Sequence, residues 1–507
     1  MKDLVTANSS GCAAADVRRS GTRPGHELDW LAALAWTLQR LGRITPLRRA
    51  LLRAAEQALR THSARPEASP RHVQAVTEDR LALALALLAT TDKALAERSL
   101  SAAGVRGLLH VLIASNLIRD GDDRAKRRFR LAHGQSPPSF LTISPSRACN
   151  LSCQGCYAGS GAMPEKLEWA IVDRVVTEAK RDWGARMFVL SGGEPLAYRD
   201  GGRGVLDLAE KHGDCFFLMY TNGTLIDENV ARRIGHLGNL SPALSAEGMR
   251  ERTDARRGPG VFDRVVQAME RLRAHGVMFG LSLTATRENA DEILSGEVVE
   301  FFFGRMWAFY GWIFQYMPIG RSFTLALMPT PEQRLHLWER TWHLVRERRL
   351  FLVDFWNSGT ASDGCMAAGR AGGYLHVNWN GAVSPCVFAP YAAANLNDLY
   401  GRGGVLTDAW ARPFFADIRK WQREYGYREC DEPRGRCGNW LAPCPIRDHH
   451  GVFRELVARH RAHPADVDAE AALADPEYIR GMEEFGVRLA KLTVPIWREQ
   501  YLDRSRR

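Results

Sequence analysis

The chain has 507 residues, of which 45% are hydrophobic and 25% charged, a composition typical of a folded globular protein and not of a disordered or fibrous one. Its length exceeds what one hydrophobic core usually supports, so a single small module is excluded and a central domain with additions is expected. The net charge of +10 comes without a basic stripe interleaved with aromatic residues, so nucleic-acid binding is not expected.

The first residues are polar and lack the continuous apolar run of a signal peptide. The most apolar early run, Leu81 to Ala89, is about half as long as a bilayer requires, so no transmembrane segment is predicted. These features predict a cytoplasmic protein. In a reducing compartment its ten cysteines favour metal ligands or reactive thiols over disulfides.

The N-terminal third divides into three predicted parts. Residues 1–25 are rich in Ser, Gly and charge and are typical of a mobile leader. From Leu28 to Ile118 apolar residues recur at helical spacing, which predicts a helical domain. Residues 120–139 are charged and end in Pro137 and Pro138, which suggests a linker, so the helical domain and its linker span 26–138.

From residue 139 to 349 short apolar runs alternate with amphipathic helices, which predicts parallel βα units. The candidate strands are Phe140–Ile143, Met187–Leu190, Phe216–Tyr220, Ala243–Ser245, Val277–Leu283 and Trp312–Met317. About six units give an α/β fold, either a partial barrel or an open sheet. Chemistry in such sheets lies in the loops at the carboxyl ends of the strands.

The last part of the chain divides again. Residues 350–455 are predicted to be loop-rich and are rich in cysteine, and residues 456–507 form a helical tail.

Three cysteines stand just after the first predicted strand, as Cys149, Cys153 and Cys156 in the spacing CX₃CX₂C. A structural zinc takes four ligands and an electron-transfer cubane takes four cysteines, so three thiolates can hold a cluster that leaves one iron open. The alternatives are a zinc knuckle that borrows a distant Cys or His, and surface thiols without a metal.

This loop resembles the signature of the radical S-adenosylmethionine (SAM) superfamily, which follows the first strand of a partial (βα)₆ barrel. The resemblance covers residues 139–455 and implies that the three cysteines hold a [4Fe-4S] cluster whose open iron is chelated by SAM. It further implies that an electron from the cluster cleaves SAM to a 5′-deoxyadenosyl radical, which abstracts hydrogen from a substrate. The position before the last cysteine, often aromatic in the superfamily, is Gly155 here, and Tyr157 follows instead.

Three further strand ends resemble cofactor contacts of the superfamily. The second strand ends in a sequence similar to the GGEP motif, which holds the amino group of the methionine moiety, and the next two end in Thr-Asn-Gly and Ser-Ala-Glu. Ordinary turns use the same residue types, and that alternative remains open. The candidate cofactor residues are Tyr157, Ser191, Gly192, Gly193, Glu194, Pro195, Thr221, Asn222, Ser245 and Glu247.

Two apolar segments, Phe301–Phe303 and Trp307–Met317, are densely aromatic. Runs of this kind usually form part of the hydrophobic core, and a pocket for an apolar or aromatic substrate is the alternative. Within the second segment, Gln315 lies near the expected sixth strand end, as does Arg321 just beyond it, and either side chain could meet a ligand.

A second set of cysteines follows residue 350, at Cys365, Cys386, Cys430, Cys437 and Cys444. The spacing CX₁₅GX₄C from Cys365 to Cys386 resembles the start of the SPASM extension, which carries auxiliary iron-sulfur clusters in radical SAM enzymes. The resemblance implies one auxiliary [4Fe-4S] cluster, for which we choose Cys365, Cys386, Cys437 and Cys444, with Cys430 as an alternate ligand. A zinc site that adds His449 or His450 is the other possibility. Cys12 and Cys215 stand apart and are not assigned as ligands.

The resemblance implies a radical SAM enzyme, and SPASM-type relatives act mostly on peptides or proteins, so a maturase for a peptide side chain is the first hypothesis. A small molecule or lipid intermediate is the second. A third class is a non-catalytic zinc or iron-sulfur protein that binds nucleic acid. The enzyme would require a reductant such as flavodoxin or ferredoxin. The substrate and the residue that quenches the radical do not follow from the sequence.

Overall fold

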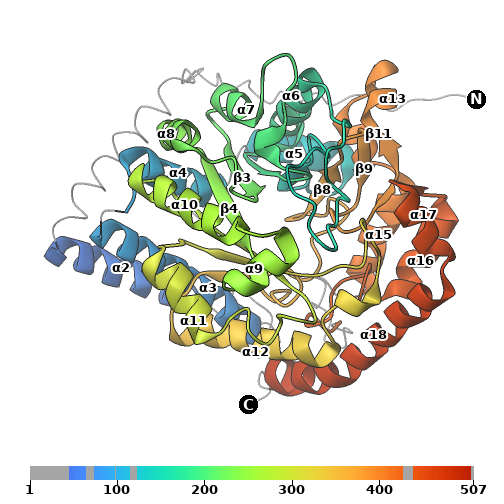
Figure 1. Ribbon diagram of the computed structural model, residues 1–507. Coiled ribbons are helices and arrows are strands. Elements are labelled where there is room, and N and C mark those ends of the chain that lie inside the picture. Colours follow the sequence, from blue (N-terminus) through green and yellow to red (C-terminus); the bar gives the residue numbers. More distant parts are fainter. Residues whose placement is uncertain (1–44, 64–73, 98, 115–122, 426–437, 504–507) are drawn as a thin grey trace, which may run out of the picture.

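A computed structural model describes residues 45–63, 74–97, 99–114, 123–425 and 438–503 (Figure 1). The predicted leader, Cys12, Cys430 and Cys437 lie outside these ranges. Within them, no helix combines the length and the apolar character that crossing a membrane requires.

Ten of the twelve described strands form one sheet in the order β11-β9-β8-β1-β2-β3-β4-β5-β6-β7. Strands β1 to β7 are paired in parallel in chain order, and β8 pairs with β1 in parallel at the other side. The strands are β1 Phe140–Ile143, β2 Met187–Leu190, β3 Phe216–Thr221, β4 Leu240–Ala246, β5 Gly280–Ala285, β6 Gly311–Gln315, β7 Leu352–Asp354, β8 Tyr374–Val377, β9 Ala382–Ser384 and β11 Ala394–Asn395. The sheet is open because β11 and β7 do not pair. The parallel strands alternate with helices along the chain, which confirms the predicted α/β fold.

Helices connect the parallel strands and cover the outer face of the sheet (Figure 1). Most of them bury an apolar face, as α10 does with Val265, Met269 and Leu272, because a parallel connection must pack back onto the sheet. The connecting helices are α6 Trp169–Glu178, α7 Val205–Lys211, α8 Glu228–Leu237, α9 Arg250–Arg257, α10 Val261–Ala274, α11 Gly296–Val299 and α12 Pro331–Glu347, with short π-helical turns η3 Ala179–Trp183 and η5 Glu300–Arg305 and 3₁₀ turns η4 Pro195–Ala197 and η6 Leu325–Leu327.

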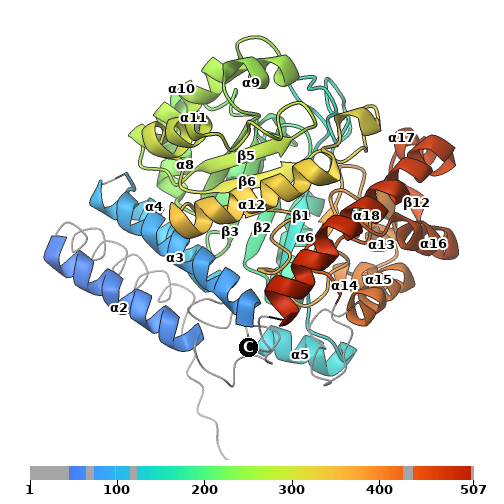
Figure 2. The same ribbon diagram turned by 90° about the horizontal axis from the view of Figure 1, so that it is seen from below.

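Three N-terminal helices lie at the amino end of the sheet, where the last of them packs against β3. They are α2 Thr45–Ser63, α3 Gln74–Ala96 and α4 Ala102–Ala114, and Figure 2 shows α3 running beside α12. In α4, Leu108 and Leu109 pack in one apolar cluster with Phe216 and Met278, which lie at the amino ends of β3 and β5. A side chain at Gly107 would place its Cβ 2.0 Å from the carbonyl oxygen of Gly238, so this glycine permits the close approach.

Two segments differ from the sequence prediction. The suggested linker contains α5 Asp123–His133, because Phe129 is buried and contacts Trp410 edge to face at 4.8 Å. The segment expected to be loop-rich contains five described strands, three whole helices and the start of a fourth, and α15 buries Phe414, Phe415 and Ile418. The remaining C-terminal elements are α13 Leu396–Gly401, α14 Leu406–Trp410, α15 Pro413–Glu424, α16 His450–His460, α17 Val467–Ala474, α18 Pro476–Ile496, the π-helical turn η7 Trp497–Asp503 and the paired strands β10 Tyr391–Ala392 and β12 His463–Pro464. The division into five segments stays a prediction.

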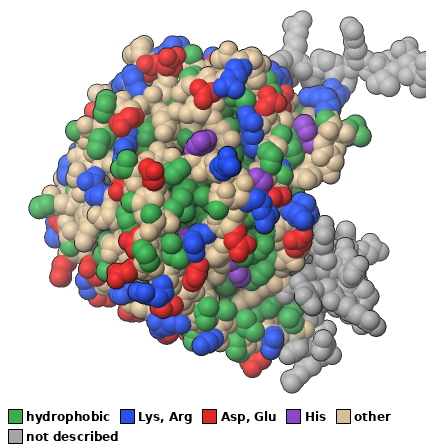
Figure 3. Space-filling view, turned by 90° about the vertical axis from the view of Figure 1, so that its right-hand side faces the viewer, with side chains coloured by type: hydrophobic (Ala, Val, Ile, Leu, Met, Phe, Trp, Pro, Cys, Tyr) green, Lys and Arg blue, Asp and Glu red, His purple; other side chains and the backbone are tan. Residues whose placement is uncertain are grey.

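The surface carries charges of both signs. On the face drawn in Figure 3, Lys and Arg side chains alternate with Asp and Glu instead of forming one basic stripe. This face therefore offers no continuous track for a phosphate backbone.

Candidate active site

A cavity of about 530 Å³ lies along the inner face of the sheet and reaches the loops after β1, β2, β3 and β4. Its lining comes from alternate strand positions, such as Thr142, Val189 and Leu218, because successive side chains of a strand point to opposite faces. The three cysteines of the first loop and most of the candidate cofactor residues also line it. They are Cys149, Cys153, Cys156, Tyr157, Ser191, Gly192, Gly193, Thr221, Asn222 and Ser245.

The three-cysteine loop is held by backbone hydrogen bonds from both sides. The Cys149 N–H donates to the carbonyl oxygen of Gly161 at 2.7 Å, and the Arg321 N–H donates to that of Cys156 at 3.0 Å. The Leu151 N–H lies 3.4 Å from Cys149 Sγ, where it would stabilise a thiolate. Burial raises the pKa of the Cys149 thiol to about 11, so a bound cation would be required to make it a thiolate at neutral pH.

The loop after β2 packs directly on the cysteine loop. The Glu194 N–H donates to the carbonyl oxygen of Ala148 at 2.8 Å, and a Cβ on Gly193 would lie 2.1 Å from that same oxygen. Gly192 has φ +100°, a conformation that glycine adopts readily, and its N–H donates to the hydroxyl of Tyr157 at 2.9 Å. The Tyr157 hydroxyl also shares a 2.6 Å hydrogen bond with that of Ser191. The two loops therefore form one backbone surface beside the cavity.

Glu194 does not line the cavity. Its buried carboxylate accepts hydrogen bonds from the Thr221 hydroxyl at 2.7 Å, the Asn222 N–H at 2.8 Å and the Leu196 N–H at 3.1 Å. Pro195 begins the turn η4 that follows. Glu194 thus joins the ends of β2 and β3, while the backbone of Gly192 and Gly193 faces the cavity.

Asn222 connects β3 to the cysteine loop. Its side-chain N–H donates to Asn150 Oδ1 at 2.9 Å and lies 3.7 Å from Cys149 Sγ. Ser245, at the end of β4, lines the cavity from the next strand.

Glu247 lies outside the cavity lining and binds two arginines that sequence reasoning missed. Its buried carboxylate accepts from Arg257 Nε at 2.5 Å and from Arg256 Nη1 at 2.6 Å, and both guanidinium groups line the cavity. Burial raises the pKa of the Cys153 thiol, whereas the charges of Arg257 and Arg256 act to lower it. Two cations balanced by one carboxylate leave net positive charge beside the thiols. The only signal in the sequence was the Arg-Arg pair nine and ten residues after Glu247.

The second cysteine set also comes together. Cys365, Cys386 and Cys444 line one small cavity, and the backbone of Phe388 donates to Cys386 Sγ at 3.4 Å. The Tyr374 hydroxyl lies 3.0 Å from the same sulfur, and burial raises the pKa of Cys386 to about 12. Four side chains separate this site from the large cavity by lining both: Met317, Phe355, Met366 and Phe388.

Among the described residues, no group of three or more His, Cys, Asp and Glu side chains is arranged to hold a single metal ion. His449 and His450 instead contact the backbone carbonyl oxygens of Ala442 and Ile446, each at 3.0 Å. The zinc alternatives therefore gain no support from this part of the chain. Each cysteine set converges on a cavity and has one backbone N–H directed at a sulfur, which suits thiolate ligands of a metal centre.

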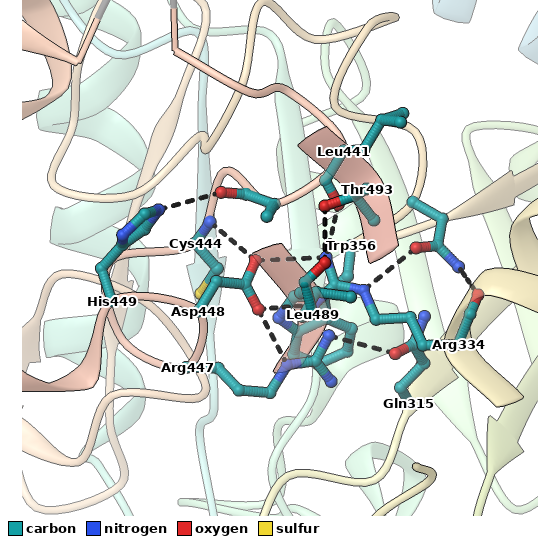
Figure 4. Close-up of polar contacts among 12 residues, drawn as sticks. Gln315, Arg334, Trp356, Leu441, Cys444, Arg447, Asp448, His449, Leu489 and Thr493 are labelled. Carbon is teal, nitrogen blue, oxygen red and sulfur yellow. Dashed lines mark hydrogen bonds and ion pairs between the residues drawn. The ribbon is translucent and has the colours of Figure 1, made fainter. Parts of the chain in front are cut away.

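Gln315 and Arg321 are both engaged with protein groups. Gln315 lines the cavity, and its side-chain amide donates to Asp354 at 3.0 Å. It also accepts from Arg447 Nη2 at 3.0 Å (Figure 4). Arg321 donates through its guanidinium to the carbonyl oxygen of Ser160.

The two aromatic segments have different roles. Phe302 and Phe303 lie on the π-helical turn η5 and are buried in the hydrophobic core, as the core interpretation predicts. In the second segment, Trp312 and Phe314 point from β6 into the cavity, so here the pocket interpretation describes the geometry better.

Comparison with known proteins agrees with this geometry. Residues 143–295 match the family model described as Radical SAM superfamily. The chain is 29% identical over 326 residues to the mycofactocin maturase MftC of Mycolicibacterium smegmatis. This alignment covers 60% of this chain and 76% of that relative. It is also 29% identical over 184 residues to the Fe-coproporphyrin III synthase of Methanosarcina barkeri, covering 35% of this chain and 45% of that protein.

Among solved structures, Streptococcus suis SuiB bound to the precursor peptide SuiA is similar with a TM-score of 0.48 and 18% identity, covering 58% of this chain and 70% of that one. The matched residues 143–295 contain the three-cysteine loop and the loops after β2, β3 and β4 that surround the cavity. Residues 143–295 are thus a radical SAM domain, and the chain is an iron-sulfur-dependent enzyme that uses a [4Fe-4S] cluster and SAM.

Proposed function

We propose that this enzyme modifies a peptide or protein side chain, as a maturase. The observation that carries the proposal is that three cysteine thiols and a largely apolar, aromatic lining share one cavity at the carboxyl ends of the parallel strands. The relative MftC, named as a maturase, aligns over 60% of the chain and supports the peptide assignment.

In this proposal Cys149, Cys153 and Cys156 are the ligands of the cluster that binds SAM. All three line the cavity, and the Leu151 N–H and the Asn222 amide stand beside Cys149 Sγ. When bound, the cluster and SAM supply a 5′-deoxyadenosyl radical that removes a hydrogen atom from the substrate.

The residues around the cysteine loop would hold SAM by charge and backbone contact. The bare backbone of Gly192 and Gly193 admits close approach of the methionine moiety, and the Ser191 and Ser245 hydroxyls supply hydrogen bonds. The Arg256 and Arg257 guanidinium groups attract its carboxylate. Glu247 holds both arginines in place by ion pairs. Glu194 joins the loops after β2 and β3, and the first of these loops carries the Ser191 and glycine contacts.

The second cysteine set would hold one auxiliary [4Fe-4S] cluster. Cys365, Cys386 and Cys444 line one small cavity, and Cys437, which precedes the described Gly438, is the proposed fourth ligand. A flavodoxin or ferredoxin would supply the electrons.

The variant Cys153→Ala tests the cluster assignment. Anaerobically reconstituted Cys153→Ala should form no 5′-deoxyadenosine from SAM and dithionite, whereas Cys215→Ala, which removes a buried thiol of the core, should retain that activity. Production by Cys153→Ala at the control rate would refute the assignment. The peptide class is tested by co-expression with the short reading frames beside the gene, followed by mass spectrometry of their products; unaltered masses in every case would count against it.

A further inference from the structure

The half of the cavity away from Cys149 and Cys153 is built from aromatic rings, some of which border the second cysteine set. Phe314 is central to it: its ring contacts those of Tyr220 at 5.2 Å, Phe355 at 5.6 Å and Phe388 at 5.8 Å, measured between centroids. Phe140 stacks on Tyr374 at 4.9 Å nearby. Such rings present faces and edges that favour another ring or a branched aliphatic group.

Charged groups are confined to the other half. Of the described residues that line the cavity, only Arg256 and Arg257 carry a full charge, and both are paired with Glu247. The aromatic half therefore offers no carboxylate to a cationic ligand and no free cation to an anionic one. A charged side chain inserted there would be desolvated without a partner, which opposes its binding strongly.

Described residues of α4 pack beneath the cavity at the amino end of the sheet. Leu218 lines the cavity and also packs in the same apolar cluster as Val105, Leu108 and Leu109 of α4. The N-terminal helices thus form a floor beneath the aromatic half. A ligand that enters from the loops reaches this floor, which suits an inserted side chain and not a chain running through.

One tyrosine hydroxyl on the cavity lining has no hydrogen-bond partner among the described residues. The other tyrosine hydroxyls on the lining contact protein groups: Tyr157 contacts Ser191, Tyr316 donates to the carbonyl oxygen of Ser322, and Tyr374 contacts Cys386. Tyr220 lines the cavity, and its hydroxyl makes no hydrogen bond to the described residues.

Tyr220 also stands at the boundary between the two halves. It directly precedes Thr221 and Asn222, which contact Glu194 and the cysteine loop. Burial raises the pKa of the phenol well above 10, so the hydroxyl stays neutral and can donate. A buried donor that faces a cavity is satisfied when a ligand supplies an acceptor.

We propose that the cavity accepts an uncharged aromatic or branched aliphatic side chain of the substrate, and that Tyr220 donates a hydrogen bond to a carbonyl oxygen beside it. The inference rests on the proposed peptide-modifying function and names the kind of residue modified. Tyr220 then holds the target side chain at the junction with the cysteine half, where the radical is generated.

The test measures binding, independently of radical chemistry. Short peptides of the form acetyl-Gly-Gly-Xaa-Gly-Gly-amide, with Phe, Leu, Lys or Glu at Xaa, are titrated against the oxidised holoenzyme with SAM and without reductant, and followed by saturation-transfer NMR of the peptide. The Phe and Leu peptides should bind at least tenfold more tightly than the Lys and Glu peptides. Equal affinity across the four, or no binding by any, would overturn the proposal.

The variant Tyr220→Phe isolates the hydrogen bond. It should weaken binding of the Phe peptide about three- to tenfold, as expected for one hydrogen bond. Tyr310→Phe is the matched control, because the Tyr310 hydroxyl contacts Ser241 and Tyr310 does not line the cavity, so affinity should be unchanged. Wild-type affinity in Tyr220→Phe would remove this residue from the proposal. Because 5′-deoxyadenosine formation is assayed separately, failure of the peptide test leaves the cluster assignment standing.

Discussion

Arg334 and Asp448 form a buried ion pair that joins α12 to the segment carrying Cys444 (Figure 4). Arg334 Nη2 donates to Asp448 Oδ2 at 3.1 Å, and both side chains are at most 1% exposed. The same carboxylate accepts from the Cys444 N–H at 3.1 Å. Arg447, on the other side of Asp448, reaches Gln315 on the cavity lining. One network therefore fixes the Cys444 segment relative to the large cavity.

Replacement of Asp448 should destabilise this network. Asp448→Asn leaves two buried guanidinium groups without their carboxylate, so we expect a loss of about 3–5 kcal/mol in the free energy of unfolding. Urea unfolding of the reconstituted protein measures it. Glu292→Gln, which breaks the exposed pair of Arg252 and Glu292, is the control and should shift the midpoint little. Equal shifts for the two variants would contradict the role of the buried pair.

The contact between the first two loops gives a steric prediction. Gly193→Ala would place a Cβ 2.1 Å from the carbonyl oxygen of Ala148, so the loops must separate and the cavity lining must shift. We expect at least tenfold weaker SAM binding by the reconstituted protein, measured by equilibrium dialysis. Gly296→Ala is the matched control, because nothing lies within 4 Å of a Cβ there. If both variants bind SAM like the wild type, the two loops are not in the contact described.

The auxiliary site should be separable from SAM cleavage. Cys386 lines only the smaller cavity, so Cys386→Ala should lose about four irons per chain, the content of one cubane, yet retain 5′-deoxyadenosine formation. Iron analysis and product chromatography measure the two effects. An unaltered iron content would dismiss Cys386 as a ligand, and complete loss of SAM cleavage would show that the two sites are not independent.

Local patterns in the sequence predicted the parts of the site that depend on neighbouring residues. Each predicted strand is present, and Cys149, Cys153 and Cys156 follow β1 as their spacing indicated. A strand and the loop after it are encoded within about ten residues, and parallel pairing then brings the loop ends together.

Contacts between distant segments could not be predicted in the same way. Arg334 and Asp448 are 114 residues apart, and neither lies in a recognisable motif. The pairing of Glu247 with Arg257 depends on the turn into α9, which brings two segments of ordinary composition together. The floor formed by α4 is likewise a tertiary contact: its apolar spacing predicts a helix but not the surface that it covers.

The last prediction concerns pH and a histidine of β8, the strand beside β1. His376 is buried, and its two ring nitrogens contact the hydroxyls of Ser144 at 2.9 Å and Ser384 at 3.0 Å. Burial lowers its pKa to about 3 from the ordinary 6.5, because the charged ring would be desolvated. Between these values the unfolded chain binds a proton that the folded chain excludes, so stability falls as the pH falls.

For His376 alone, lowering the pH from 7 to 5 should cost about 2 kcal/mol of unfolding free energy. Urea midpoints at pH 7, 6 and 5 measure the slope in the wild type. His376→Gln can keep a hydrogen bond to Ser144 or Ser384 but has no group that titrates in this range. Its free energy of unfolding should therefore be lower at pH 7 and depend less on pH. Parallel pH dependence in the two proteins would mean that His376 is not held neutral, since other buried histidines contribute equally to both.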